Sequence, residues 1–180
     1  TKAIIMLYGV FGNESMEKTL SLSEYNNIVR WLIQGKMRPA DLLRPEVVSA
    51  AARGANLEEQ RLVSLLGRGL QLGFAVEEWQ RSGIWVISRS DDDYPARYKT
   101  HLKDKAPPLL FGAGERSLLK GGGLGMVGSR NIDKAGEDFA LDVAEVCAAN
   151  QMPVVSGGAR GVDQVSMRAA LDAGGTVIGV

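Results

Sequence analysis

The chain has 180 residues, 45% of them hydrophobic and 23% charged, which is ordinary composition for one globular domain or two small ones. Its 21 basic and 21 acidic side chains cancel, so any binding site for a polyanion must be local rather than spread over the surface. One cysteine and one histidine exclude an intrachain disulfide and a zinc site built from three or four such ligands.

The first apolar run, AIIMLYGVF at 3–11, is too short for a membrane-spanning helix, which needs about 20 apolar residues. It also lacks the small-residue cleavage pattern of a secretory signal. We therefore expect a cytoplasmic protein with no membrane partner. The chain begins at Thr1 without a methionine and ends at Val180 within a predicted strand, so we expect it to be truncated at its C-terminal end.

Residues 1–82 are predicted to form an all-helical accessory domain. Ser21 and Glu24 have the spacing of a capping box, and the apolar helical pattern that follows them stops at Gly35. Pro45 divides the next helical stretch into two short helices. None of these residues suggests a chemical function.

The hydrophobic period changes at Gly83, after two further helical stretches, the first with Asn56 as its predicted N-cap. The segment IWVIS at 84–88 is β-branched and aromatic and predicts a strand. A polar loop follows, and Pro107–Pro108 lead into a second short strand at 109–111. This change of period predicts a domain boundary between residues 82 and 83.

Strands and helices then alternate to the end of the chain. The segments GLGMV, MPVVS and TVIGV predict strands, and the two longer segments between them predict helices. Cys147 lies in the first of these helices and is expected to be a core residue. This alternation predicts a parallel sheet with right-handed crossovers, and residues 83–180 are therefore predicted to form a Rossmann-like α/β domain with helices on both faces.

Two glycine turns follow predicted strands and precede predicted helices: GSR at 128–130 and SGGARG at 156–161. Ligands of open parallel sheets bind beyond the carboxyl ends of the strands, where unpaired N–H groups and helix dipoles favour anions. Arginine can bind phosphate with two parallel hydrogen bonds. We expect two adjacent phosphate sites, formed by Gly128, Ser129, Arg130, Lys134, Ser156, Gly157 and Arg160.

The local charge agrees with a polyanion, since residues 94–134 carry eight basic and three acidic side chains. Asp163 is expected to cap its helix or to hold Arg160 in place. No paired carboxylates or nucleophile lie near the glycines, so no enzyme, cofactor or metal is predicted. The dinucleotide fingerprint at a helix start and the P-loop pattern are both missing from the sequence.

Five segments between Gly83 and Val180, taken in order, resemble the DNA-processing protein A family of bacterial natural transformation, also called Smf. They are GIWVISRSDDDYP, APPLLFGAG, GMVGSRNIDKAG, VVSGGARGVD and RAALDAGGTVIGV. The resemblance implies an extended Rossmann-like domain that binds single-stranded DNA without enzymatic turnover. It also implies protection of incoming strands, assistance in loading a RecA-type recombinase, a homodimer, and phosphate contacts from the two glycine turns.

Two positions depart from the family pattern. Met167 stands where the family usually has histidine, and Gly158 replaces a usual leucine. The resulting SGG version of the turn also resembles a wider superfamily of nucleotide-binding and phosphoribohydrolase proteins. A nucleotide-binding sensor or phosphoribohydrolase-like enzyme on the same fold is therefore the alternative function. An interaction scaffold with a vestigial cleft is a third one.

Overall fold

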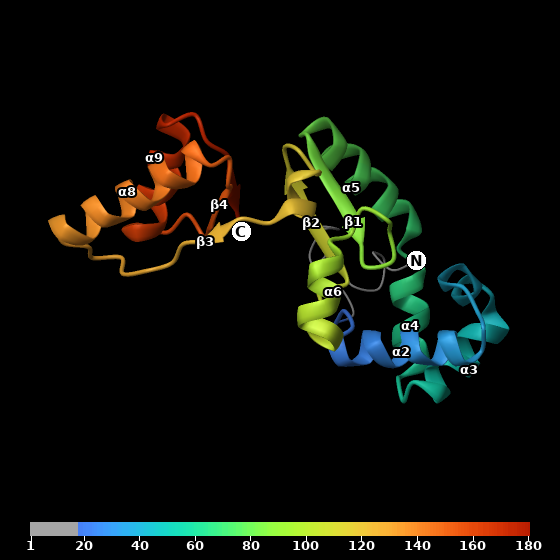
Figure 1. The fold of residues 1–180 in the computed structure, drawn as a ribbon. Helices are drawn as coiled ribbons and strands as arrows, with labels where there is room; N and C mark the ends of the chain where they lie inside the picture. Colours follow the sequence, from blue (N-terminus) through green and yellow to red (C-terminus); the bar gives the residue numbers. More distant parts are fainter. Residues whose placement is uncertain (1–17) are drawn as a thin grey trace. The chain divides into compact units, whose positions relative to one another are not determined.

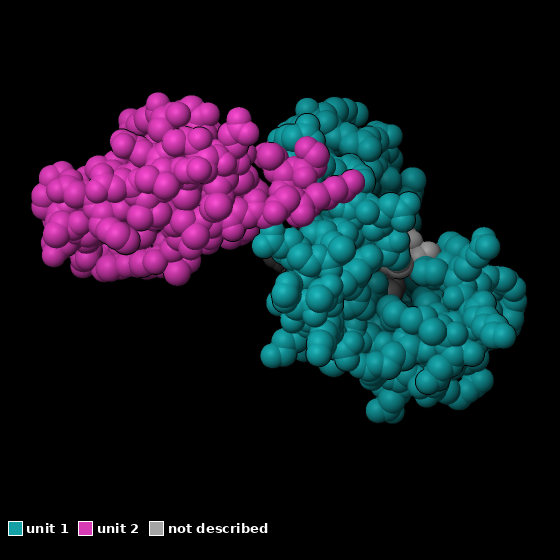
Figure 2. Space-filling model, in the orientation of Figure 1, with its two compact units in different colours: residues 1–116 teal, residues 117–180 magenta. Residues whose placement is uncertain are grey.

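The structure, a computed structural model, describes residues 18–180 and shows a mixed α/β protein (Figure 1). The chain divides into two compact units, residues 1–116 and residues 117–180 (Figure 2). The domain boundary expected at 82/83 stays a prediction, and the apolar run at 3–11 lies outside the described residues. Within residues 18–180, no helix has both the length and the apolar character needed to cross a membrane.

Helices occupy the first described part of unit 1, where the sequence pattern predicts them. Their bounds are α2 Leu22–Gln34, the 3-10 helix η1 Pro39–Leu43, α3 Pro45–Gly54, α4 Glu59–Leu66 and α5 Gly69–Arg81. The capping box is confirmed: the Glu24 N–H donates to Ser21 Oγ (3.3 Å), and the Ser21 N–H donates to Glu24 Oε2 (2.7 Å). Pro45 begins α3, where its missing N–H costs nothing.

The prediction that Asn56 caps a helix is wrong. Asn56 lies in the left-handed region (φ 55°) just after α3, and its N–H donates to the Arg53 carbonyl. Asparagine tolerates this backbone conformation better than most residues, so it ends one helix instead of starting the next. The N-cap of α4 is Glu58.

The helices of unit 1 enclose an apolar core. Its buried members come from α2, η1, α3, α4 and the residues beside them: Leu20, Tyr25, Ile28, Leu32, Leu42, Val48, Ala51, Ala52, Ala55, Leu62, Leu65 and Leu66. The spacing of three and four residues between most neighbours is the period of an amphipathic helix. Burial of this face is what holds these short helices together, because isolated helices of this length are marginal in water.

The second part of unit 1 contains β1 (Ile84–Ser88), α6 (Ala96–Leu102), the 3-10 helix η2 (Lys103–Lys105) and β2 (Leu109–Ala113). The strands β1 and β2 pair antiparallel. The buried Tyr94 donates its hydroxyl to the Pro107 carbonyl (2.8 Å) and so fixes the loop between them. This contact gives the Tyr-Pro and Pro-Pro segments of the sequence a structural role.

Arg89 connects these strands to the helices. Its guanidinium donates to Asn26 Oδ1 (2.7 Å) and to the Ala106 carbonyl (3.2 Å), and lies 5.3 Å from the centre of the Tyr25 ring. Asn26 in turn donates to the Asp104 carbonyl (2.8 Å). These contacts join residues far apart in sequence, and they explain why the helices and the β1–β2 sheet form one compact unit.

Unit 2 contains α7 (Leu118–Gly121), β3 (Leu124–Gly125), α8 (Lys134–Ala149), β4 (Val154–Ser156), α9 (Val162–Asp172) and β5 (Val177–Gly179). The three strands are parallel, in the order β3-β4-β5. The predicted α/β class and its strand–helix alternation are therefore confirmed. The predicted Rossmann-like arrangement is shown in part: three parallel strands alternate with helices.

Helices α8 and α9 pack side by side (Figure 1). Small residues form this contact face, among them Ala140, Ala144 and Cys147 of α8. The core position expected for Cys147 is thus confirmed. Phe139 is another apolar residue of α8, but its side chain is 68% exposed. The helix buries its face of small residues against α9, and Phe139 does not belong to that face.

Candidate functional site

The parallel register brings the two glycine turns to one edge of the sheet. Gly125 of β3 lies opposite Val155 of β4, and Ser156 lies opposite Gly179 of β5. The three strands therefore end together. The first turn leaves β3 toward α8, and the second leaves β4 toward α9, so both lie beyond the carboxyl ends of the strands, where ligands of such sheets bind.

The two turns touch each other. The Val162 N–H donates to the Ser129 carbonyl (3.2 Å). Gly161 has a φ of +91°, and a Cβ there would overlap the same carbonyl oxygen. A Cβ on Gly128 would lie 2.5 Å from Val162 Cγ2. Glycine is therefore required at both positions, since any side chain would push the turns apart.

The turns present a set of free backbone donors. Within residues 18–180, no acceptor is hydrogen-bonded to the N–H groups of residues 128–130 or 157–161. The second turn also ends at the N-terminus of α9, whose dipole adds positive potential. Converging free N–H groups at a helix start form an anion-binding concavity.

Two arginines stand beside these donors. Arg130 and Arg160 are exposed, and neither makes an ion pair or side-chain hydrogen bond within the described part of the chain. Each guanidinium is therefore available for a bidentate contact with a phosphate. The geometry brings together the two predicted turns and leaves both predicted arginines accessible.

Lys134 differs from the arginines. Its Nζ lies 2.8 Å from Asp138 Oδ1 and 3.7 Å from Glu137 Oε2, all on the first two turns of α8. The hydrogen bond to Asp138, together with the negative charges of both carboxylates, raises the pKa of Lys134. The ammonium stays charged, but a phosphate would have to compete with two carboxylates for it.

The two serines already donate their hydroxyl protons inside the protein. Ser156 is buried, and its Oγ donates to the Met126 carbonyl (2.7 Å), which ties the end of β4 to the residue after β3. Ser129 Oγ donates to the Asn131 carbonyl (2.6 Å) and accepts from the Asn131 N–H (3.1 Å). Both hydroxyls therefore shape the turns.

The expectation for Asp163 is wrong on both counts. The N-cap of α9 is Gly161, and no bond joins Asp163 to Arg160. The side chain of Asp163 is buried under the second turn instead, and its Oδ2 would lie 3.1 Å from a Cβ on Gly157. Helical side chains lean toward the N-terminus, which directs this carboxylate back under the turn.

Residues 18–180 hold no cluster of three or more His, Cys, Asp or Glu side chains that could bind a metal ion. A cavity of about 680 Å³ does adjoin the first turn. Its walls include the apolar Val127, Ile132 and Phe139, with Ser129 and Asn131 as polar members. The sequence pattern did not single out Phe139 as a member of the site. The signal that could have done so is the row of small residues Ala140, Ala144 and Cys147 on α8, which marks the face that the helix buries.

Comparison with known proteins identifies the family of this chain. A sequence model of the family described as DNA recombination-mediator protein A matches residues 85–180. The DNA processing protein DprA of Streptococcus pneumoniae is 42% identical over 160 residues, which cover 81% of this chain and 55% of that protein. The DNA processing protein DprA of Bacillus subtilis is 34% identical over 103 residues, which cover 57% of this chain and 34% of that protein.

The X-ray structure of DNA processing protein A from Streptococcus pneumoniae has the same fold, with a TM-score of 0.69 and 25% sequence identity. The match covers 89% of this chain and 53% of that chain. This chain thus spans about a third to about half of the relatives that it matches. The resemblance inferred from the five segments is confirmed: the chain belongs to the DNA recombination-mediator protein A family, whose relatives carry the name DNA processing protein DprA.

Proposed function

We propose that this chain binds the phosphates of single-stranded DNA over its two glycine turns, as part of a protein that processes DNA in natural transformation. The observation that carries the proposal is the set of free N–H groups at 128–130 and 157–161, flanked by the unpaired Arg130 and Arg160. Membership of a family of DNA processing proteins supports DNA as the source of the phosphates.

In this proposal, each residue has a distinct role. Backbone N–H groups and the α9 dipole hold the phosphates, and Arg130 and Arg160 add charge and bidentate hydrogen bonds. Gly157 keeps the backbone open to a close approach. Ser129 and Ser156 position the turns, and Lys134 assists only when phosphate displaces Asp138.

A single strand suits the site better than a duplex. Its unstacked bases are free to contact apolar and aromatic surfaces, and such contacts add affinity without sequence preference. The cavity beside the first turn provides these surfaces, with the largely exposed Phe139 on its wall. A duplex keeps its bases stacked inside and could use only the phosphate contacts.

Four further properties are part of this proposal, and membership of the family is the only support for them. They are a cytoplasmic location, a homodimer, assistance to a RecA-type recombinase, and the lack of enzymatic turnover. Binding by backbone donors and arginines needs no catalytic group and no cofactor. The accessory role of the N-terminal helices also remains a proposal.

The test is fluorescence anisotropy of a labelled oligothymidylate at low and moderate salt. The variant Arg130→Glu/Arg160→Glu should bind at least about 100-fold more weakly, because two phosphate contacts become repulsive. Arg168→Glu is a charge-reversal control on the same unit, since Arg168 is an exposed arginine of α9 that pairs with Asp172 (3.9 Å) and lies outside both turns. Equal affinity of the double variant and the wild type would overturn the proposal.

The same experiment separates the alternative function. A nucleotide-binding sensor or phosphoribohydrolase-like enzyme would use the same free N–H groups for one phosphate. It would bind no oligothymidylate at micromolar concentration. A mononucleotide would instead raise the melting temperature of the protein, and that shift would disappear in Arg130→Glu/Arg160→Glu.

A further inference from the structure

One carboxylate lies beneath the second glycine turn without a partner. Asp163 is only 8% exposed, and within residues 18–180 its side chain makes no ion pair and no hydrogen bond. Its Oδ2 would lie 3.1 Å from a Cβ on Gly157, so the carboxylate is close to the backbone of that glycine. Buried polar groups are almost always hydrogen-bonded, because leaving one unpaired costs free energy. The position of Asp163 therefore needs an explanation.

The dipole of α9 explains why this carboxylate is tolerated. Asp163 lies in the first turn of α9, where the positive end of the helix dipole favours an acidic side chain. The same positive potential, together with the free N–H groups at 157–161, is what this turn offers to a phosphate. Asp163 and a bound phosphate therefore compete for one source of positive potential, and the carboxylate weakens phosphate binding.

Asp163 acts on a phosphate through charge and not through a hydrogen bond. An ionised carboxylate only accepts hydrogen bonds, and the ionised oxygens of a phosphate also only accept them. Two acceptors cannot bond to each other, so repulsion is the interaction that remains. Because a Coulomb energy is proportional to the product of the two charges, the repulsion grows with the charge of the ligand.

This repulsion distinguishes two classes of phosphate. A phosphodiester within a DNA strand carries a single negative charge. A phosphate monoester, at the end of a strand or on a free nucleotide, carries about 1.5 to 2 negative charges at neutral pH. We propose that Asp163 is a specificity-determining residue of the second turn, which shifts its preference from phosphate monoesters toward the phosphodiesters of DNA. This inference rests on the proposed function, because it assumes that phosphate binds at the turns.

The turns still attract phosphate in the presence of Asp163. Arg130 and Arg160 are exposed and have no ion-pair partner in the part of the chain that the structure describes. These two positive charges exceed the single negative charge of Asp163. The carboxylate therefore adjusts which phosphate is preferred and does not prevent binding.

The test compares Asp163→Asn with the control Asp172→Asn. Asparagine keeps the size of the side chain and removes its charge. Asp172 is an exposed acid at the other end of α9, about 13 Å away along the helix axis, which is beyond the screening length at physiological salt. The control therefore changes the net charge of the protein by the same amount, away from the turn.

The two ligands are matched as well. Thymidine 5′-phosphate is a monoester, and thymidine 5′-methyl phosphate is a diester of nearly the same size. Shifts of the amide signals of residues 157–161 during NMR titration at neutral pH give the dissociation constant of each ligand. Thermal melting checks that every variant keeps the wild-type fold.

We expect Asp163→Asn to bind the diester about threefold and the monoester about tenfold more tightly, since the monoester loses nearly twice the repulsion. Asp172→Asn should leave the ratio of the two affinities at the wild-type value. Asp163→Ser is a second neutral variant, for the case that the amide of asparagine prevents folding. It should change the ratio in the same direction.

Three results would overturn the inference. Equal gains for the two ligands, or no gain, would mean that the turn does not respond to the charge of the phosphate. Weaker binding of both ligands by a folded variant would mean that Asp163 holds the turn in place. The same change of ratio in Asp172→Asn would assign the effect to net charge. The proposed function fails by a separate result, which is the inability of the wild type to bind oligothymidylate in the anisotropy experiment.

Discussion

Two arginines of unit 1 and two arginines of unit 2 have opposite environments. In unit 1, Arg61 and Arg89 are bonded to side chains and carbonyls around them, and the side chain of Arg61 is only 16% exposed. In unit 2, Arg130 and Arg160 are exposed and have no partner among the described residues. Arg61 and Arg89 are therefore structural cross-links, whereas Arg130 and Arg160 are accessible and are the phosphate contacts of our proposal.

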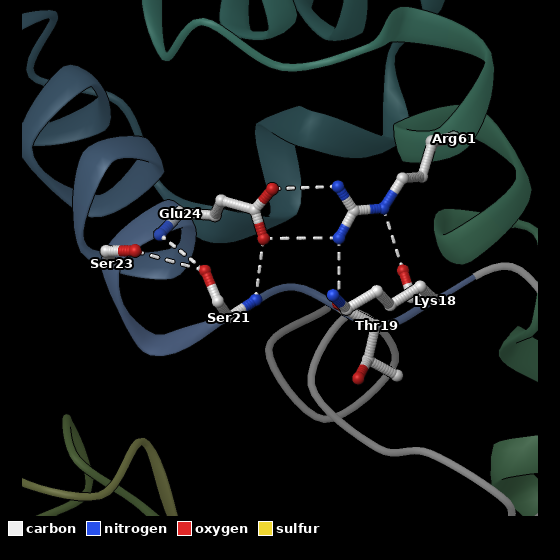
Figure 3. A network of polar contacts seen from close by, with 6 residues as sticks. All are labelled: Lys18, Thr19, Ser21, Ser23, Glu24 and Arg61. Carbon is white, nitrogen blue, oxygen red and sulfur yellow. Dashed lines mark hydrogen bonds and ion pairs between the residues drawn. The ribbon is translucent and has the colours of Figure 1, made fainter.

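The guanidinium of Arg61 is hydrogen-bonded within the protein by each of its three nitrogen atoms (Figure 3). Arg61 donates to both carboxylate oxygens of Glu24 (2.8 and 3.1 Å) and to the carbonyls of Lys18 and Thr19 (2.8 Å each). The same carboxylate accepts from the Ser21 N–H. All of these bonds close within the protein, so the network stabilises the start of α2 and offers nothing to a ligand.

The largest effect is expected where the two turns of unit 2 touch. Gly161→Ala should destabilise unit 2 by about 2–4 kcal/mol and abolish DNA binding, because its Cβ would overlap the Ser129 carbonyl at an unfavourable φ. Gly174→Ala is the control: its φ is also positive (74°), but nothing surrounds its Cβ. Urea unfolding measures the free energy of unfolding of both variants. An equal loss of stability in the two would show that the close approach of Gly161 to the Ser129 carbonyl is not required.

Breaking the cross-link of unit 1 should cost slightly less and spare DNA binding. Arg61→Ala removes the donor to the carbonyls of Lys18 and Thr19 and leaves the Glu24 carboxylate with only the Ser21 N–H, which should lower the free energy of unfolding by about 2–3 kcal/mol. The affinity for oligothymidylate should stay at the wild-type value. Urea unfolding and anisotropy test the two halves of this prediction, and a parallel loss of affinity would contradict the division of roles.

Acid should weaken the same cross-link. The hydrogen bonds from Arg61 lower the pKa of Glu24 from 4.5 to about 2, against the opposing effect of burial. A depressed carboxyl pKa adds stability above the unfolded value of 4.5, and that stability is lost as the pH falls from about 4.5 to about 2. Allowing for solvent screening, we expect about 1–2 kcal/mol. Glu24→Gln should flatten this part of the pH–stability curve, and an unchanged curve would contradict the assignment.

The smallest effect is expected from a hydroxyl that shapes the turns. Ser156→Ala removes the donor to the Met126 carbonyl and should cost about 1 kcal/mol of stability. DNA affinity should fall only a few-fold, because the free N–H groups remain. A loss as large as that of Arg130→Glu/Arg160→Glu would mean that Ser156 contacts DNA directly.

Local sequence signals were enough for much of the fold. The Ser21–Glu24 capping box, the break at Pro45 and the strand–helix alternation after Leu124 all depend on neighbouring residues. Asn26 accepts a hydrogen bond from Arg89 and donates one to the Asp104 carbonyl. These bonds could not be predicted in this way, because they join positions 63 and 78 residues apart. The antiparallel pairing of β1 with β2 is non-local in the same sense.

In the candidate site, too, features that depend on local backbone pattern were predictable and features that depend on side-chain direction were not. Glycines between a strand and a helix located both turns correctly, since that pattern depends on backbone geometry. The position of Asp163 under the second turn and the pairing of Lys134 with Asp138 depend on side-chain directions. Phe139 was missed because hydrophobic periodicity does not tell which of two apolar faces a helix buries.

The central claim is that the backbone N–H groups of the two turns bind phosphate. Amide chemical shifts measured by ¹H–¹⁵N NMR during titration with a short oligothymidylate test this directly. We predict that the largest shifts fall on residues 128–130 and 157–161 and that they weaken as salt is added. Shifts confined to other residues, with these amides unmoved at saturating DNA, would contradict the account.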